Sequence, residues 1–274
     1  MSALTLRIIT AVILAVGFLA VLFFAPVIYA AAFLSFALLI AITEWAGFAG
    51  WKPWPGRTIY ALVAAAVMLA SWQQPEPQSL LLPALAVAAI MWVLALLALL
   101  SWTRRIAKPV VVISGLLFLL PAWLTAERLI LAGSDGPVLL FLLFWIVAAA
   151  DIGAYFTGKA LGKHKLLPRV SPGKTIEGLI GGLISAAVAA CLGHYLLDWA
   201  LPQAALLGVS VGMASVVGDL TVSLFKRNAG LKDSGKILPG HGGVLDRIDG
   251  VVAALPLYTV LLSWFGKLPP LIMV

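Results

Sequence analysis

Long, uninterrupted runs of apolar residues recur along the whole chain, and they limit its possible folds more than any other feature of the sequence. A helix needs about 20 apolar residues to cross the hydrocarbon core of a bilayer. Only helices and closed barrels can span that core, and apolar runs that do not alternate with polar residues favour helices. We therefore predict nine membrane-spanning helices. They cover residues 6–24, 26–48, 58–72, 80–101, 109–126, 137–157, 176–197, 203–225 and 249–266.

The composition leads to the same fold class. Hydrophobic residues make up 63% of the chain and charged residues only 11%, whereas soluble domains carry about 25% charged residues. So few charges cannot cover a surface that faces water, and lipid must therefore solvate much of the protein. The first run follows Arg7 as in a signal peptide, but it is too long for one, and we interpret it as a retained span. The sequence predicts an all-α polytopic membrane protein.

The basic residues predict which ends of the helices face the cytoplasm, because cytoplasmic loops carry an excess of Lys and Arg. If the N-terminus is cytoplasmic, nine spans place all of the 18 Lys and Arg residues on that side except Arg128 and Lys267. Omitting the short third span would scatter them over both sides. The asymmetry also accounts for the net charge of +7 without nucleic acid as a partner. Glu127, beside Arg128, is expected to be an ordinary acid of an outer loop.

The polar residues concentrate in the second half of the chain. Spans one to five form an N-terminal group, residues 1–136, and spans six to nine form a predicted catalytic group, residues 137–274. The two longest polar loops, 158–175 and 226–248, belong to the second group and are cytoplasmic in this topology. The one cysteine, Cys191, lies in an apolar run, which excludes a disulfide framework and a cysteine zinc cluster.

Six carboxylates lie at or near the predicted cytoplasmic ends of the spans, where ionisable residues are costly and indicate function. Asp219, Ser223 and Lys226 share one helical face, because they are spaced four and three residues apart. Asp246 and Asp249 share a face at the start of the last span. Clustered carboxylates repel one another unless a cation lies among them, and hard oxygen ligands suit Mg²⁺. The remaining acids of the six are Glu44, Asp151 and Glu177.

Each carboxylate also has a structural interpretation, and the sequence leaves the choice open. Asp246 and Asp249 could favour the N-terminus of a helix. Asp219 could pair with Lys226 or with a basic residue of another helix. Asp151 could be a buried, hydrogen-bonded acid, since structural networks perturb acids as well. For Glu44, a structural role is favoured.

The stretch from Ser223 to Asp249 combines the residue types that handle phosphate groups. Four Lys and Arg residues precede a Pro-Gly-His-Gly-Gly turn, and acids follow it. Glycines allow positive φ and close approach of backbone N–H groups to phosphate, and Lys and Arg bind phosphate oxygens. A loop that binds anionic lipid head groups would explain the basic residues, but not the acids and the His-Gly-Gly turn among them.

This stretch resembles the signature of phosphatidate cytidylyltransferases, also called CDP-diacylglycerol synthases. The signature reads Ser-x-apolar-Lys-Arg, four residues, Lys-Asp-x-small, two residues, and apolar-Pro-x-His-Gly-Gly-apolar-x-Asp-Arg-apolar-Asp. Residues 223–249 match its fixed positions. Residues 151–159 and 171–178 resemble the second conserved region of the family, whereas the N-terminal half resembles the family only in being apolar and multi-spanning.

The resemblance implies that CTP and phosphatidic acid react to give CDP-diacylglycerol and pyrophosphate. The lipid phosphate is already an anionic nucleophile, so metal and basic side chains would act by positioning and electrostatics. We expect Asp219, Asp246 and Asp249 to hold Mg²⁺, with Asp219 and Asp246 favoured among the three, and a second, monovalent cation such as K⁺ is an option. The expected catalytic residues are Asp219, Ser223, Lys226 and Asp246. The expected substrate-binding residues are Ser171, Lys174, Arg227, Lys232, Lys236, His241, Gly242, Gly243 and Arg247.

The expected partners are CTP, phosphatidic acid, the lipid bilayer and a second copy of the chain in a homodimer. The resemblance places the protein in the bacterial cytoplasmic (inner) membrane, with its active site facing the cytoplasm. Gly181, Gly182, Gly208, Gly212, Ser215 and Gly218 offer small surfaces for close packing, either within the chain or in the dimer.

Two other classes of function remain as alternatives. A CTP-dependent lipid or polyprenol kinase would use similar ions but would transfer the γ-phosphate. An ion-coupled transporter would use the acids as an ion path, but transporters usually have inverted repeats and midplane sites. Here the acids gather at one face, and mostly in the second half of the chain.

Overall fold

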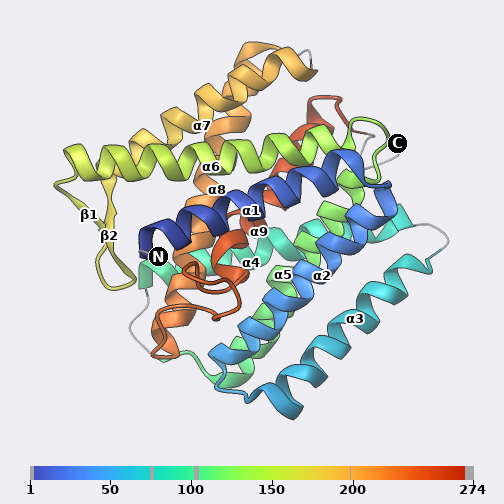
Figure 1. The fold of residues 1–274 in the computed structure, drawn as a ribbon, viewed down its shortest axis with the longest axis vertical. Helices are drawn as coiled ribbons and strands as arrows, with labels where there is room; N and C mark the ends of the chain where they lie inside the picture. Colours follow the sequence, from blue (N-terminus) through green and yellow to red (C-terminus); the bar gives the residue numbers. More distant parts are fainter. Residues whose placement is uncertain (1–2, 75–76, 102–104, 198, 269–274) are drawn as a thin grey trace.

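The computed structural model describes residues 3–74, 77–101, 105–197 and 199–268, and this part of the chain is mostly helical (Figure 1). Helices satisfy every backbone hydrogen bond within one segment, as a bilayer requires. The α-helices of the described part are α1 (Ala3–Phe24), α2 (Val27–Phe48), α3 (Thr58–Trp72), α4 (Leu81–Ser101), α5 (Lys108–Ile130), α6 (Gly136–Leu161), α7 (Ile176–Leu197), α8 (Leu201–Asn228) and α9 (Leu245–Trp264).

Each predicted span coincides with one of these helices. By length and composition, six helices in the described part could cross a membrane, namely α2, α4, α5, α6, α7 and α8. Helix α3 has only 15 residues, and α9 opens with charged residues. The chain is therefore an all-α polytopic membrane protein, while the total of nine spans, the orientation and the two groups of spans remain predictions. Arg104, one of the predicted cytoplasmic residues, lies outside the described residues.

Proline marks the start of several helices. Pro109, Pro137 and Pro202 stand in the first turns of α5, α6 and α8, where the missing N–H would have no helical partner and the fixed φ suits a helix. Two short turns, η1 (Pro53–Arg57) and η2 (Pro77–Leu80), precede α3 and α4. A local sequence signal therefore marks the starts of α5, α6 and α8.

A small β-hairpin occupies the loop between α6 and α7. Strands β1 (Lys165–Leu167) and β2 (Ser171–Thr175) pair antiparallel, with Lys165 opposite Thr175 and Leu167 opposite Ser171. The hairpin projects from the ends of α6 and α7 (Figure 1). The sequence predicted only a polar loop here, and the pairing fixes the direction in which β2 presents its side chains.

Small residues allow α6, α7, α8 and α9 to pack at very short distances. A Cβ on Gly182 would lie 2.8 Å from the carbonyl oxygen of Ala150, and Gly208 lies directly against the backbone of Ala186. Gly218 of α8 likewise contacts the backbone of Asp249 in α9. The small residues noted in the sequence thus pack helices within one chain, as in other membrane proteins.

An aromatic cluster connects the N-terminal helices to α8. Trp45 of α2 donates a hydrogen bond from Nε1 to the carbonyl oxygen of Val111 in α5, at 2.7 Å. The centroids of the Trp45 and Phe225 rings lie 4.8 Å apart. Because Trp45 is fully buried, these contacts fix the end of α2 against the end of α8.

The prediction for Glu127 was wrong. Helix α5 continues to Ile130, so Glu127 lies inside the helix and is only 2% exposed. Its Oε1 accepts a hydrogen bond of 2.7 Å from the hydroxyl of Ser35 in α2, and Trp123 donates to the same serine at 2.8 Å. Tertiary partners on α2 stabilise an acid that local sequence assigned to a loop.

Candidate active site

Two aspartates from different helices meet near one end of the bundle. Asp219 belongs to α8 and Asp249 to the second turn of α9. Gly218 and Gly250 lack side chains at the crossing, so the two helices approach closely, and Ser215 fills the space beside Gly250. The Asp249 side chain interacts with that of Asp219 as a result. Helix packing therefore joins two acids that are 30 residues apart in a sequence of 274.

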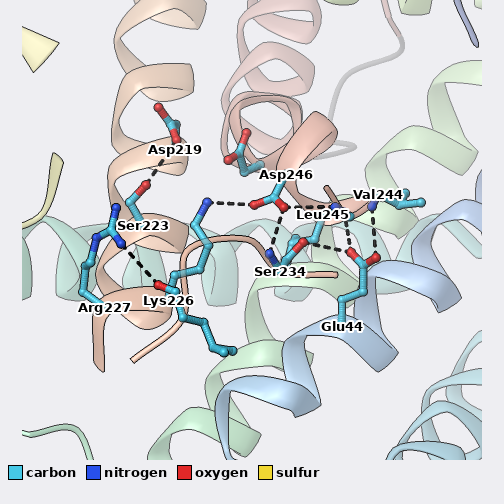
Figure 2. Close-up of polar contacts among 12 residues, drawn as sticks. Glu44, Asp219, Ser223, Lys226, Arg227, Ser234, Val244, Leu245 and Asp246 are labelled. Atoms are coloured by element: carbon cyan, nitrogen blue, oxygen red, sulfur yellow. Dashed lines mark hydrogen bonds and ion pairs between the residues drawn. The ribbon is translucent and has the colours of Figure 1, made fainter. Parts of the chain in front are cut away.

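Strand β2 brings a basic side chain to this acid pair. Lys174 forms an ion pair with Oδ2 of Asp219, and both side chains are about one-third exposed. Ser223, one turn further along α8, donates a hydrogen bond of 3.4 Å to Oδ1 of Asp219 (Figure 2). The hairpin between α6 and α7 thus brings Lys174, one of the predicted substrate-binding residues, into contact with Asp219.

A pocket of about 440 Å³ adjoins the ion pair. Helix α6 supplies Asp151, Tyr155 and Lys159 to its wall, and β2 supplies Lys174. The ammonium of Lys159 lies 5.9 Å from the centroid of the Tyr155 ring. Pockets of a few hundred Å³ with a few convergent polar groups are typical of small-molecule sites, so the pocket can admit a phosphate-bearing ligand between α6, α7 and the hairpin.

Lys226 and Asp246 form a second ion pair, which is more deeply buried. Their Nζ and Oδ1 atoms are 2.7 Å apart, and the Asp246 side chain is only 6% exposed. Oδ2 of Asp246 accepts hydrogen bonds from the backbone N–H groups of Ser234 at 2.8 Å and Gly243 at 3.1 Å (Figure 2). Asp246 precedes the apolar part of α9. Burial raises the pKa of its carboxyl, but Lys226 and the two N–H groups lower it further, below the usual value.

Glu44 of α2 reaches the same region from the N-terminal half. Its Oε2 accepts hydrogen bonds from the N–H of Leu245 at 2.8 Å and from the hydroxyl of Ser234 at 3.0 Å, and Oε1 accepts one from the N–H of Val244 at 3.1 Å (Figure 2). The two N–H groups belong to the start of α9, whose first N–H groups lack helical partners, and the Ser234 hydroxyl belongs to the chain segment between α8 and α9. The structural role favoured for Glu44 agrees with these contacts.

Residues 229–244, between α8 and α9, are here called the substrate loop. A tight turn connects Leu238 to Gly242, whose backbone groups are hydrogen-bonded at 2.9 Å. Gly240 and Gly242 have φ of 75° and 81°, which other residues rarely adopt. His241 lies between them, and its buried Nδ1 has no hydrogen-bond partner among the described residues. Lys232 and Lys236 are exposed on the outer part of the loop.

The two arginines of the signature point to different partners. Arg227 donates from Nε to the carbonyl oxygen of Val170 at 3.4 Å and from Nη1 to that of Leu231 at 3.3 Å. It therefore links the hairpin to the substrate loop. Arg247 is exposed and interacts electrostatically with Asp151. Ser171 opens β2 and is half-buried.

The pair of Asp219 and Asp249 fits a magnesium ion better than Asp246, the third predicted ligand, does. No group of three or more His, Cys, Asp or Glu side chains with metal-site geometry occurs in the described part of the chain. Mg²⁺, however, is usually bound by one or two carboxylates together with waters and substrate phosphates. Asp219 and Asp249 offer two neighbouring carboxylates of this kind. The oxygens of Asp246 are engaged by Lys226 and two backbone N–H groups, and its side chain is only 6% exposed, whereas the Asp219 side chain is 33% exposed and its partners are side chains.

The structure therefore separates the predicted residues into two clusters. Ser223 and Lys174 contact the acid pair of Asp219 and Asp249 beside the pocket, whereas Asp246 joins Glu44 at the base of the substrate loop. Lys226 pairs with Asp246 and also interacts electrostatically with both members of the acid pair. The sequence did not assign Asp151 and Lys159 a role, although their region resembles the family. Their position on the pocket wall could have been suspected from Asp151 alone, an acid in the middle of an apolar helix.

Comparison with known proteins identifies the family of this chain. The sequence model of the cytidylyltransferase family matches residues 5–265. A phosphatidate cytidylyltransferase of Pseudomonas aeruginosa is 42% identical over 272 residues, which cover 93% of this chain and 96% of that protein. One of Haemophilus influenzae is 36% identical, with 92% and 96% covered. One of Staphylococcus aureus is 47% identical over 131 residues, about half of each chain. The resemblance of the signature is therefore confirmed, and this chain belongs to the cytidylyltransferase family.

Proposed function

We propose that the chain transfers the cytidylyl group of CTP to phosphatidic acid and releases CDP-diacylglycerol and pyrophosphate. A phosphate oxygen of the lipid attacks the α-phosphorus of CTP, and the bond from that phosphorus to the bridging oxygen of the β-phosphate breaks. The observation that carries this proposal is the meeting of Asp219, Asp249 and Lys174 beside a pocket. The full-length relatives named as phosphatidate cytidylyltransferases support the same reaction.

The acidic and the basic side chains of the site have different proposed roles. Asp219 and Asp249 would hold Mg²⁺. The bound ion would neutralise negative charge on the triphosphate of CTP. Lys174 and Lys159 face the pocket and attract phosphate oxygens, and the exposed Lys232 and Lys236 draw CTP toward the substrate loop. No proton must leave the lipid phosphate, so no general base is required. Asp246 remains a further candidate for the metal, together with a second, monovalent ion such as K⁺.

Membrane placement follows from the two substrates. CTP is soluble, whereas the diacyl tails of phosphatidic acid stay in lipid, so the site must lie at a membrane boundary. We place it at the cytoplasmic face of the bacterial inner membrane, with nine spans and a cytoplasmic N-terminus. The excess of Lys and Arg on that side supports the orientation. A homodimer, without nucleic acid, completes the proposed assembly.

The decisive assay uses the purified chain in detergent micelles with labelled CTP, phosphatidic acid and Mg²⁺. The expected products are pyrophosphate and a lipid that carries CMP. A CTP-dependent lipid kinase would instead give CDP and a newly phosphorylated lipid, so polyprenol and diacylglycerol are supplied as acceptors in parallel. Reactions without phosphatidic acid, and reactions with a chelator, are the controls. A folded preparation that forms neither pyrophosphate nor the CMP-bearing lipid contradicts the proposal.

A further inference from the structure

Glu44 contacts the substrate loop although it lies about 200 residues away in the sequence. It stands near the end of α2, in the part of the chain outside the signature and the second conserved region. Its side chain is 2% exposed, and its two oxygens accept hydrogen bonds from Ser234, Val244 and Leu245. The last two donors are backbone N–H groups where the loop joins α9. Glu44 thus connects the middle of the loop to its end.

Two glycines of the loop leave the space that Glu44 occupies. The three nearest atoms to a Cβ placed on Gly235 all belong to the Glu44 side chain. A Cβ on Gly243 would meet both Glu44 oxygens and the hydroxyl of Ser234. Neither glycine has a positive φ, so their lack of a side chain is explained by this close packing and not by backbone conformation.

Asp246 contacts the same loop segment that Glu44 contacts. It accepts hydrogen bonds from the N–H groups of Ser234 and Gly243 while it pairs with Lys226. Ser234 therefore donates its backbone N–H to Asp246 and its hydroxyl to Glu44 (Figure 2). Glu44 and Asp246 therefore bind both ends of the segment 234–245. The turn from Leu238 to Gly242, which contains His241, lies between these two ends.

We propose that Glu44 is a positioning residue for the reaction, and that it acts by holding the substrate loop in the conformation that presents Lys236 and His241. This inference rests on the proposed cytidylyl transfer for its kinetic readout only. Glu44 contacts no atom of the acid pair, so its effect passes through the loop. The N-terminal half of the chain thereby contributes to the active site.

The first test compares Glu44→Gln with wild type in the full-length purified protein. Glutamine fits the same space but cannot accept at both terminal atoms. Lys232 and Lys236 are exposed trypsin sites in the substrate loop, and Lys165 and Arg169 are exposed reference sites in and beside the hairpin. Loop cleavage relative to the reference sites should rise at least about 10-fold, because losing a charge-assisted hydrogen bond shifts local opening by about that factor.

The kinetic readout separates positioning from substrate binding. We expect kcat for cytidylyl transfer to fall by about 100-fold, since a small misplacement of reacting groups costs about that much. The KM for phosphatidic acid should stay close to the wild-type value, because Glu44 contacts the substrate loop and the start of α9 and none of the residues that line the pocket. Glu44→Gln with wild-type kcat and wild-type loop cleavage overturns the inference.

Glu127→Gln is the matched control. Glu127 is also 2% exposed, lies in the N-terminal half and accepts a hydrogen bond from a serine hydroxyl, but it does not contact the substrate loop. This variant should leave loop cleavage and kcat close to wild type. If the two variants change loop cleavage and kcat equally, both acids act only through the overall stability of the protein. That result would overturn the positioning role of Glu44.

A pair of substitutions tests the contact if Glu44→Gln fails to fold. Gly235→Ala should push the Glu44 side chain away and increase loop cleavage, and Glu44→Asp, with its shorter side chain, should relieve part of that effect in the double variant. Coupled residues give effects that do not add, so strictly additive effects contradict the inference. An inactive wild-type protein would refute the proposed reaction, while the cleavage pattern would still decide the role of Glu44.

Discussion

At the residue scale, the carboxylates of this protein differ in what their oxygens contact. Asp219 and Asp249 face each other and a lysine beside a pocket. The oxygens of Asp246 and Glu44 accept hydrogen bonds from backbone N–H groups, a buried lysine and a serine. The first pair is placed to bind an added cation, and the second pair is placed to hold the chain. This distinction gives opposite expectations for otherwise similar substitutions.

Asp219→Asn should reduce kcat by about 10³-fold, equivalent to about 4 kcal/mol, because a metal ligand supplies charge stabilisation of that order. Binding of Mn²⁺ in the presence of CTP, followed by electron paramagnetic resonance, should weaken in parallel. The unfolding temperature should change little, since Asp219 is about one-third exposed. Full turnover in this variant would refute the assignment of Asp219 to the metal.

Asp246→Asn should instead destabilise the protein, because Lys226 would keep a buried charge without a partner. Breaking one side of a buried ion pair costs about 3–5 kcal/mol, and thermal unfolding in detergent measures the loss. Replacing both members, as in Lys226→Met with Asp246→Leu, should recover much of the stability but no activity. A stable Asp246→Asn variant with normal loop cleavage contradicts this structural role.

The sequence predicted that six acids lie near those ends of the spans that we assign to the cytoplasm, but not which of them share a cluster. Hydropathy places a residue along the membrane normal, because each span has a known length. It carries no information on which helices are neighbours. Glu44 and Leu245 meet through tertiary packing, in which Trp45 next to Glu44 contacts α5 and α8. For the same reason, the sequence assigned Asp219, Asp246 and Asp249 to one metal site, whereas in the structure the Asp249 side chain interacts with Asp219 and the Asp246 side chain pairs with Lys226.

At the element scale, the helices were predictable and the hairpin was not. Apolar runs of about 20 residues identify helices in lipid almost without ambiguity. Strands β1 and β2 have only three and five residues, and they contain Pro172 and Gly173, which disfavour strands. Their pairing is stabilised by the two helices that they connect. The position of Lys174 in the site therefore depended on an element without a clear sequence signal.

Gly208→Ala tests how much the close contact between α7 and α8 matters. A Cβ at Gly208 would meet the backbone of Ala186 and Ala187, which cannot move without shifting α7. Overpacking of this kind costs about 1–3 kcal/mol, more than the gain of about 1 kcal/mol in helix propensity. Gly17→Ala in α1 is the control, because a Cβ there meets nothing within 4 Å. Thermal unfolding should show a loss for the first variant only.

At the scale of the whole molecule, the unsettled feature is the number and direction of membrane crossings. Helix α3 is short, and α9 begins with charged residues, so length alone assigns neither as a span. The distribution of Lys and Arg assigns α3, because leaving it out would move the hairpin and the substrate loop to the side opposite Arg7, Lys52 and Arg57. The apolar run from residue 249 to 266 is what predicts α9 as a span. The proposed site needs cytoplasmic CTP. A topology that places the site on the other side of the membrane would therefore also contradict the proposed function.

Single cysteines in a Cys191→Ser background measure this topology. Gln73 follows α3, Ser134 precedes α6, Trp264 ends α9, and Lys165 lies in the hairpin, all with exposed side chains. In intact cells, a membrane-impermeant maleimide should label Gln73→Cys, Ser134→Cys and Trp264→Cys, whereas Lys165→Cys should react only after permeabilisation. If α3 does not cross, Gln73→Cys and Ser134→Cys become protected while Lys165→Cys is labelled from outside. That result would place the pocket away from cytoplasmic CTP and would remove the basis for the proposed reaction at that face.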